Sequence, residues 1–148
     1  MDIPWWYYLI SILIALVVWC VWKKPYLGIL IGYSFLIFTE TILIRTPFDG
    51  EHLQLELFWS WKAWETQRKQ VIANVIMFIP VGVFVGCLWK WRGVIFAVVL
   101  SVAIELLQLV SRRGLCELDD VLHNSFGAVF GICITILIKK LLIKEKFE

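Results

Sequence analysis

Acidic side chains gather in one stretch of this sequence that is otherwise strongly apolar. Residues 101–131 read SVAIELLQLVSRRGLCELDDVLHNSFGAVFG, a pattern typical of an apolar helix, a charged turn and a second apolar helix. The carboxyl groups of Glu105 and Asp120 have the chemistry of a general acid or base, so these two are the candidate catalytic residues. Ionisable groups near hydrocarbon are costly and usually functional, and this stretch is therefore the first candidate for a site.

Further polar residues flank other apolar runs, and their chemistry suits binding of a ligand. Arginine side chains can hold a phosphate or carboxylate through paired N–H groups. Gln108 follows Glu105 by three residues, so both side chains share one helical face. We expect the ligand-binding residues to be Glu40, Arg45, Asn74, Gln108, Arg112, Arg113, Asp119 and Asn124.

Several of these polar residues also have a purely structural interpretation. Asp119 could cap the helix that it opens. Arg112, Arg113 and Glu117 could form a solvated turn, and His123 is more often an interfacial histidine with satisfied hydrogen bonds than a ligand. These alternatives stay open from the sequence.

Glu40 and Glu105 are harder to explain structurally, because each lies inside a long apolar run. A charged residue within a membrane span costs about 2.5–3.5 kcal/mol even on the lenient insertion scale. We therefore expect a functional role for both glutamates, or ion pairs between helices.

The composition of the chain indicates a membrane protein. Of its 148 residues 61% are hydrophobic and nine are Trp, whereas soluble domains contain about 45–50% apolar residues. Several runs reach the length of about 17–25 apolar residues that crosses a bilayer as a helix, and none alternates as a barrel strand does. The sequence predicts one all-α domain over residues 1–148, a polytopic membrane helical bundle of about five transmembrane helices.

The loop between the second and third predicted spans is the longest in the chain. The predicted spans are residues 5–22, 26–44, 71–89, 94–110 and 121–138, so the loop covers 45–70. Residues 52–62 nearly alternate, which favours an extended segment, yet Leu53, Leu57 and Trp61 also fit one helical face. Because tryptophans favour headgroup depth, we expect this loop to lie in the membrane interface.

The spans bring their polar residues to the same side of the membrane. Glu40, Asn74, Glu105 and Asp120 all lie near the ends of spans that meet one leaflet. The opposite face carries eight Lys and Arg residues against six, and basic residues favour the cytoplasmic side. We therefore expect an outer-leaflet site, an external N-terminus and a cytoplasmic C-terminus.

Small residues follow the polar ones along two of these spans. Asp120, Asn124, Gly127 and Gly131 recur at intervals of four, three and four residues, and Gly82 continues a similar line from Asn74. Glycines on such a stripe let another helix approach closely. Pro80 lies inside the same span as Gly82 and could bend it.

Three motifs in this order resemble the VanZ-like family. They are N-x-x-x-F-x-P-x-G at residues 74–82, E-x-x-Q at 105–108 and D-x-x-x-N-x-x-G at 120–127, followed by Gly131. The resemblance covers residues 45–131, and Arg45 matches an arginine that follows an early span in the family. A loop element close to N-L-x-P-F matches either 46–48 or 55–58. The resemblance implies an integral membrane protein of bacteria, and the family's namesake is associated with lowered susceptibility to the glycopeptide teicoplanin.

Three classes of function are consistent with these residues. The first is an enzyme that acts on a lipid-linked or cell-envelope substrate at the outer leaflet, and the second is a binder or transporter of an envelope lipid or amphiphile. In the third, the acids and arginines only pair between helices and hold the bundle together. We rank first a site that binds or acts on a cell-envelope lipid or glycopeptide-related ligand and lowers glycopeptide susceptibility.

The expected partners are membrane lipids and a cell-wall precursor or lipid-linked ligand. The net charge of +2 gives no indication of nucleic acid. No cofactor or oligomeric state can be named and no metal motif stands out, although the acids with His123 could hold a divalent cation. The four cysteines form no CxxC pair, and only Cys116 lies in a polar turn, where it could be a reactive thiol.

Overall fold

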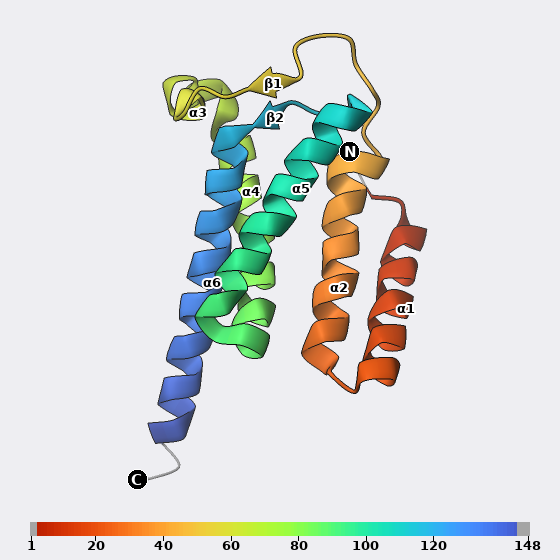
Figure 1. Ribbon diagram of the computed structural model, residues 1–148, viewed down its shortest axis with the longest axis vertical. Coiled ribbons are helices and arrows are strands. Elements are labelled where there is room, and N and C mark those ends of the chain that lie inside the picture. Colours follow the sequence, from red (N-terminus) through yellow and green to blue (C-terminus); the bar gives the residue numbers. More distant parts are fainter. Residues whose placement is uncertain (1–2, 145–148) are drawn as a thin grey trace.

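Long helices lie side by side in the computed structural model, which describes residues 3–144 (Figure 1). They are α1 (Trp5–Trp22), α2 (Pro25–Phe38), α4 (Trp64–Trp89), α5 (Gly93–Ser111) and α6 (Leu118–Lys144). Short elements are the π-helical turn η1 (Thr39–Leu43), β1 (Leu53–Gln54), α3 (Trp59–Lys62), the 3₁₀ turn η2 (Lys90–Arg92) and β2 (Cys116–Glu117). Lys146, one of the basic residues counted for the orientation, lies outside the described residues.

The predicted membrane spans are confirmed. Within residues 3–144, the helical stretches long and apolar enough to cross a membrane are Trp5–Trp22, Pro25–Leu43, Trp64–Ser111 and Leu118–Leu142. The third has 48 residues and reverses direction at η2, so α4 and α5 run back along each other. The chain is therefore an all-α, multi-pass membrane protein.

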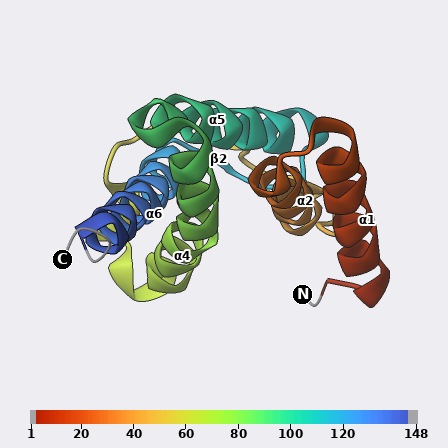
Figure 2. The ribbon, with the colours of Figure 1, turned by 90° about the horizontal axis from the view of Figure 1, so that it is seen from below.

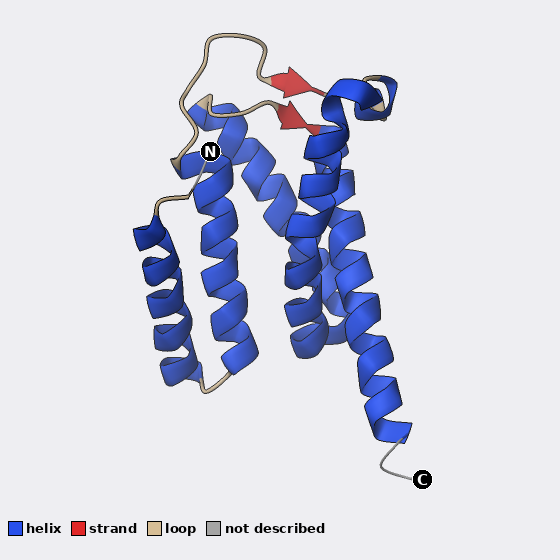
Figure 3. Cartoon of the chain, turned by 180° about the vertical axis from the view of Figure 1, so that it is seen from behind, coloured by secondary structure: helices blue, strands red, loops and turns tan. Residues whose placement is uncertain are grey.

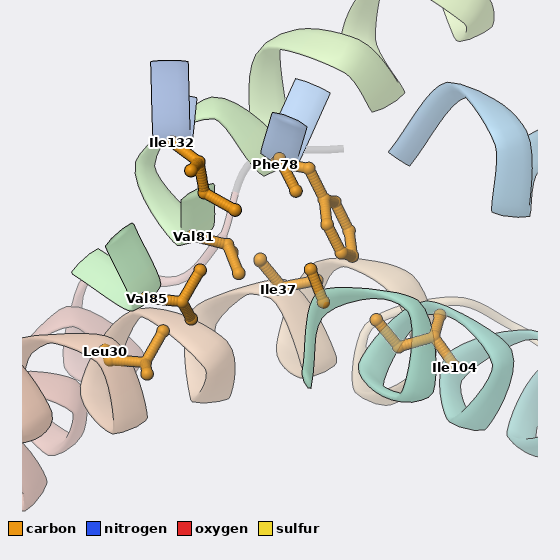
Figure 4. Close-up of a cluster of buried hydrophobic side chains, with 9 residues drawn as sticks. Leu30, Ile37, Phe78, Val81, Val85, Ile104 and Ile132 are labelled. Carbon is orange, nitrogen blue, oxygen red and sulfur yellow. The ribbon is translucent and has the colours of Figure 1, made fainter. Parts of the chain in front are cut away.

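The helices form two groups that meet along α2. Seen from below, α1 and α2 make one hairpin, and α4, α5 and α6 make a bundle (Figure 2). The buried core joins the two groups, and Figure 4 shows Leu30 and Ile37 of α2 facing Phe78, Val81 and Val85 of α4. This packing joins α2 of the hairpin to α4 of the bundle.

Close contact between α4 and α6 depends on the predicted glycine stripes. A Cβ atom added at Gly127 would collide with the carbonyl oxygen of Val75, and one at Gly131 with that of Ile79. A Cβ at Gly82 would collide with the carbonyl oxygen of Ala128. The expectation that these glycines let another helix approach is confirmed. Pro80 lies within α4, which remains one continuous helix.

Residues 53–62 cross one end of the bundle, and we refer to them as the cover segment (Figure 3). Strand β1 pairs in parallel with β2, with Leu53 opposite Cys116, and α3 follows. Both interpretations of this loop are thus partly right, because it is extended at 53–54 and helical at 59–62. The rings of Trp61 and Trp64 stack, and the two residues are 59% and 38% exposed.

Candidate functional site

Four buried carboxyl groups lie beneath the cover segment, and we name them the carboxylate cluster. They come from α5, β2 and the first turn of α6: Glu105, Glu117, Asp119 and Asp120, with exposed fractions of 4%, 3%, 1% and 8%. Within residues 3–144, none of these acids has a Lys or Arg partner within ion-pair distance. Buried charges are normally paired, so this cluster is the least expected feature of the bundle.

Asp119 holds the cover segment against α6. Its Oδ1 accepts a hydrogen bond from the backbone N–H of Phe58 at 2.7 Å. Its Oδ2 accepts from the N–H of Ser60 at 3.0 Å and from the Ser60 hydroxyl at 2.6 Å. Asp119 thus satisfies the free donors at the start of α3. The interpretation of Asp119 as the cap of its own helix is therefore wrong.

Glu117 is also bonded to the cover, and its partners use both carboxyl oxygens. Its Oε2 accepts from the indole N–H of Trp59 at 2.8 Å, and its Oε1 accepts from the Gln70 amide at 2.9 Å. The interpretation of Glu117 as part of a solvated turn is wrong, because its side chain is buried.

Glu105 and Asp120 differ from these two acids, because each uses only one carboxyl oxygen. Glu105 Oε2 accepts from the backbone N–H of Glu117 at 2.8 Å, and Asp120 Oδ2 accepts from Gln70 at 3.1 Å. Asp120 Oδ1 is 3.8 Å from Nδ1 of His123, which is too far for a hydrogen bond. Within residues 3–144, no hydrogen bond is made to Glu105 Oε1 or Asp120 Oδ1.

Amide groups beside these acids also keep free acceptor atoms. The Asn124 Nδ2 donates to the Ser101 hydroxyl at 2.8 Å, and the Gln108 Nε2 approaches the Thr41 carbonyl at 3.4 Å. The buried Oδ1 of Asn124, Oε1 of Gln108 and Nδ1 of His123 have no hydrogen-bond partner in the described part of the chain. Unsatisfied buried polar atoms are rare in folded proteins and often mark a functional site or a bound molecule.

Within residues 3–144, the predicted site residues Glu40 and Asn74 make no hydrogen bond to the carboxylate cluster. Glu40 lines a separate cavity of about 270 Å³ with Tyr8, Tyr33 and Met77, where α1, α2 and α4 meet. Asn74 is half-buried on α4, and its Nδ2 has no partner among the described residues. The inter-helix ion pair expected as one role for Glu40 and Glu105 is absent from residues 3–144.

The arginines do not line the carboxylate cluster as phosphate ligands would. Arg113 donates from Nη1 to the carbonyl oxygens of Ile42 and Leu43 at 3.2 and 3.1 Å, which satisfies acceptors at the end of η1. Arg112 and Arg45 are exposed. Arg45 attracts Glu105 electrostatically, but no ion pair between them is present in the described chain.

Sequence reasoning missed two residues that organise the cluster. Gln70 bridges Glu117 and Asp120, and Ser60 binds Asp119. Gln70 directly precedes the predicted third span, and a polar residue at such a boundary was the available signal. Ser60 gave no signal, because its partner is 59 residues away.

The cluster does not have the geometry of a metal site. Within residues 3–144, no group of three or more His, Cys, Asp or Glu side chains could hold a metal ion. The suggestion that acids and His123 hold a divalent cation has no support in this arrangement.

The environment of β2 disfavours ionisation of its side chains. Burial raises the pKa of Glu117 above its usual 4.5 and the nearby Asp120 raises it further, while hydrogen bonds from Trp59 and Gln70 oppose this shift. Burial, Glu105 and Glu117 together raise the pKa of the Cys116 thiol. Since the thiolate is the reactive form, Cys116 is a poor nucleophile.

We expect the stability of the wild-type fold to fall as pH rises through the raised pKa of Glu117. The folded state favours protonated Glu117, so this contribution is complete below the unfolded pKa and is lost above the folded one. Melting temperatures across this range should fall more steeply in the wild type than in Glu117→Gln, which cannot ionise. Parallel curves would show that Glu117 is not the titrating group.

Comparison with known proteins gives two matches of different extent. The family model described as VanZ/LLP1 matches residues 6–139. Protein VanZ of Enterococcus faecium is 30% identical over 84 residues, which cover 54% of this chain and 52% of that protein. The chain therefore spans about half the length of this curated relative. No solved structure gives a significant match.

Proposed function

Because the chain belongs to the VanZ/LLP1 family, we propose that its carboxylate cluster binds or acts on a cell-envelope lipid or glycopeptide-related ligand. Engagement of that ligand at the outer leaflet lowers susceptibility to glycopeptides such as teicoplanin. The relative named Protein VanZ supports this general role.

One observation carries the proposal: Glu105 and Asp120 are buried, lack a Lys or Arg partner in the described chain and retain one unbonded carboxyl oxygen each. Asp119 uses both oxygens to hold the cover segment, and Glu117 uses one for Trp59 of the cover and the other for Gln70 of α4, so the arrangement of these two acids is explained by structure. Glu105 and Asp120 have no such explanation. Either can accept a proton as a general base or a hydrogen bond from a bound head group.

The free atoms around these acids indicate the chemistry of the ligand. Gln108 and Asn124 present unpartnered amide oxygens, which accept hydrogen bonds as carboxylates do. An acceptor-rich site favours hydroxyl or ammonium groups over phosphate. The part of the ligand held here is therefore a sugar, an amino sugar or an amine-bearing peptide, and any phosphate group lies elsewhere.

The orientation proposed for the chain places this site at the outer surface. The opposite end carries Lys23, Lys24, Lys90, Arg92, Lys139 and Lys140, and basic residues favour the cytoplasm. The N-terminus is then external and the C-terminus cytoplasmic.

Substitution of the two free acids tests the proposed function. In a glycopeptide-susceptible bacterial host, the wild-type protein should raise the inhibitory concentration of teicoplanin. Glu105→Gln and Asp120→Asn should each reduce this protection about tenfold or more, because a hydrogen bond to a charged group contributes about 1.5–3 kcal/mol. Glu65→Gln is the matched control, since Glu65 is an exposed acid on α4.

Membrane levels and melting temperatures of all variants must be measured alongside the susceptibility. Loss of protection with an intact fold supports the site. Full protection by both variants, or none by the wild type at normal membrane levels, contradicts the proposal. Unfolding of both variants with a wild-type fold in Glu65→Gln would instead favour a structural role for the acids.

A further inference from the structure

A second cavity lies at the end of the bundle opposite the carboxylate cluster. It has a volume of about 410 Å³ and lies where η2 meets the C-terminal part of α6. Its lining residues are Gly86, Lys90, Trp91, Ile136, Lys139 and Lys140. A neighbouring hollow of about 430 Å³ shares Lys90 and Trp91 and adds Trp89 and Arg92. We refer to the first hollow as the basic cavity.

Among the described residues, the charged side chains that line the basic cavity are all lysines. No acidic residue within 3–144 lines the basic cavity or the neighbouring hollow. Among these residues, Lys90, Lys139 and Lys140 make no ion pair. Lys139 donates to the carbonyl oxygen of Cys87 at 3.3 Å, which directs its ammonium group towards the end of α4. Three lysines therefore surround one hollow with room for an anion.

The walls of the basic cavity suit a lipid better than a free ion. Ile136 supplies an apolar wall, and Trp91 is 54% exposed beside the lysines. Tryptophan at a membrane boundary lies at headgroup depth, with an apolar ring and a polar N–H group. The exposed apolar side chains of Leu137 and Ile138 continue from this end along α6, where acyl chains would run.

The backbone at Lys90 is an independent sign that this side chain matters. Lys90 has φ 54° and ψ −135°, a conformation that residues with a Cβ adopt rarely. Glycine would adopt it without this cost. Lysine does not stabilise the backbone of this turn, so its presence at position 90 points to a role for the side chain.

We propose that the basic cavity binds the phosphate group of an anionic phospholipid from the leaflet opposite the carboxylate cluster. Lys90, Lys139 and Lys140 hold the phosphate oxygens, Trp91 packs beside the glycerol region, and the acyl chains follow α6. Basic pockets between transmembrane helices recognise anionic head groups by this chemistry. No bond is made or broken, so the lipid acts as a bound partner.

The test compares two lysine pairs at the same end of the molecule. Purified protein in nanodiscs of phosphatidylcholine is titrated with phosphatidylglycerol, and the rise in melting temperature gives the apparent affinity. Lys139→Gln with Lys140→Gln should weaken that affinity about tenfold or more. Lys23→Gln with Lys24→Gln removes the same charge from the α1–α2 turn, outside the basic cavity, and should leave the affinity within about twofold.

A third variant separates binding from folding. Lys90→Gly should keep or raise the melting temperature in pure phosphatidylcholine, because glycine adopts the backbone conformation at position 90 without steric strain. The same variant should still lose affinity for phosphatidylglycerol. Equal losses in the two lysine pairs would show only general surface attraction and overturn the proposal. Unchanged affinity in Lys139→Gln with Lys140→Gln would overturn it too, as would equal stabilisation by inorganic phosphate alone.

Discussion

Replacing Gly127 with alanine should destabilise the bundle by about 1–3 kcal/mol, and replacing it with leucine should prevent α4 and α6 from packing. A Cβ atom at this position collides with the carbonyl oxygen of Val75. That oxygen belongs to the backbone of α4 and cannot rotate away, so the helices must separate. Within a membrane, such close packing is a main source of helix association.

Unfolding of the purified protein in mixed micelles, followed by circular dichroism, measures this effect. Gly50→Ala is a matched control, because a Cβ there meets only the side chain of Phe48 in an exposed loop. The described glycines all have negative φ, so alanine introduces no backbone strain at either position. Equal stability of Gly127→Ala and Gly50→Ala would contradict the role of the stripe.

Asp119→Ala should detach the cover segment while leaving the spans folded. The substitution removes the acceptor of three hydrogen bonds and leaves the buried donors of Ser60 without a partner. Each buried donor left unsatisfied costs about 1–3 kcal/mol. Asp119→Asn should have a smaller effect, since it keeps one acceptor oxygen.

Hydrogen exchange of the amide groups in residues 53–62 measures this detachment. Exchange should become faster in Asp119→Ala, while the amides of α4 and α5 keep their protection. Glu56→Ala removes an exposed acid of the same segment that pairs with Lys62, and it serves as the control. Unchanged protection of 53–62 in Asp119→Ala would show that other contacts hold the cover.

Hydropathy was sufficient to predict the spans but not their full length. The predicted start of the third span was residue 71, whereas α4 begins at Trp64. The added residues, WETQRKQ, are mostly polar. An apolar window detects only the part of a helix that lipid surrounds, so the polar first turns were assigned to the loop.

Helical spacing predicted the close packing, because a fixed interval places glycines on one face. Gly127 and Gly131 therefore lie against α4 as expected. Spacing could not predict that Asp119 binds Ser60, or that Arg113 caps η1, because these contacts join segments 59 to 71 residues apart. Arg113 was a candidate ligand-binding residue because of its residue type alone. The tertiary structure shows that its guanidinium group already donates to backbone carbonyl oxygens.

We propose that Glu105 and Asp120 hold a ligand at the covered end of the bundle. Mass spectrometry of the lipids retained by purified protein tests it most directly. The wild type should retain an envelope lipid with hydroxyl or amine groups, and Glu105→Gln with Asp120→Asn should retain about tenfold less. Glu56→Gln with Glu65→Gln, an equal change of charge on exposed acids, should match the wild type. Identical lipid content in all three proteins, with intact folds, would contradict the claim.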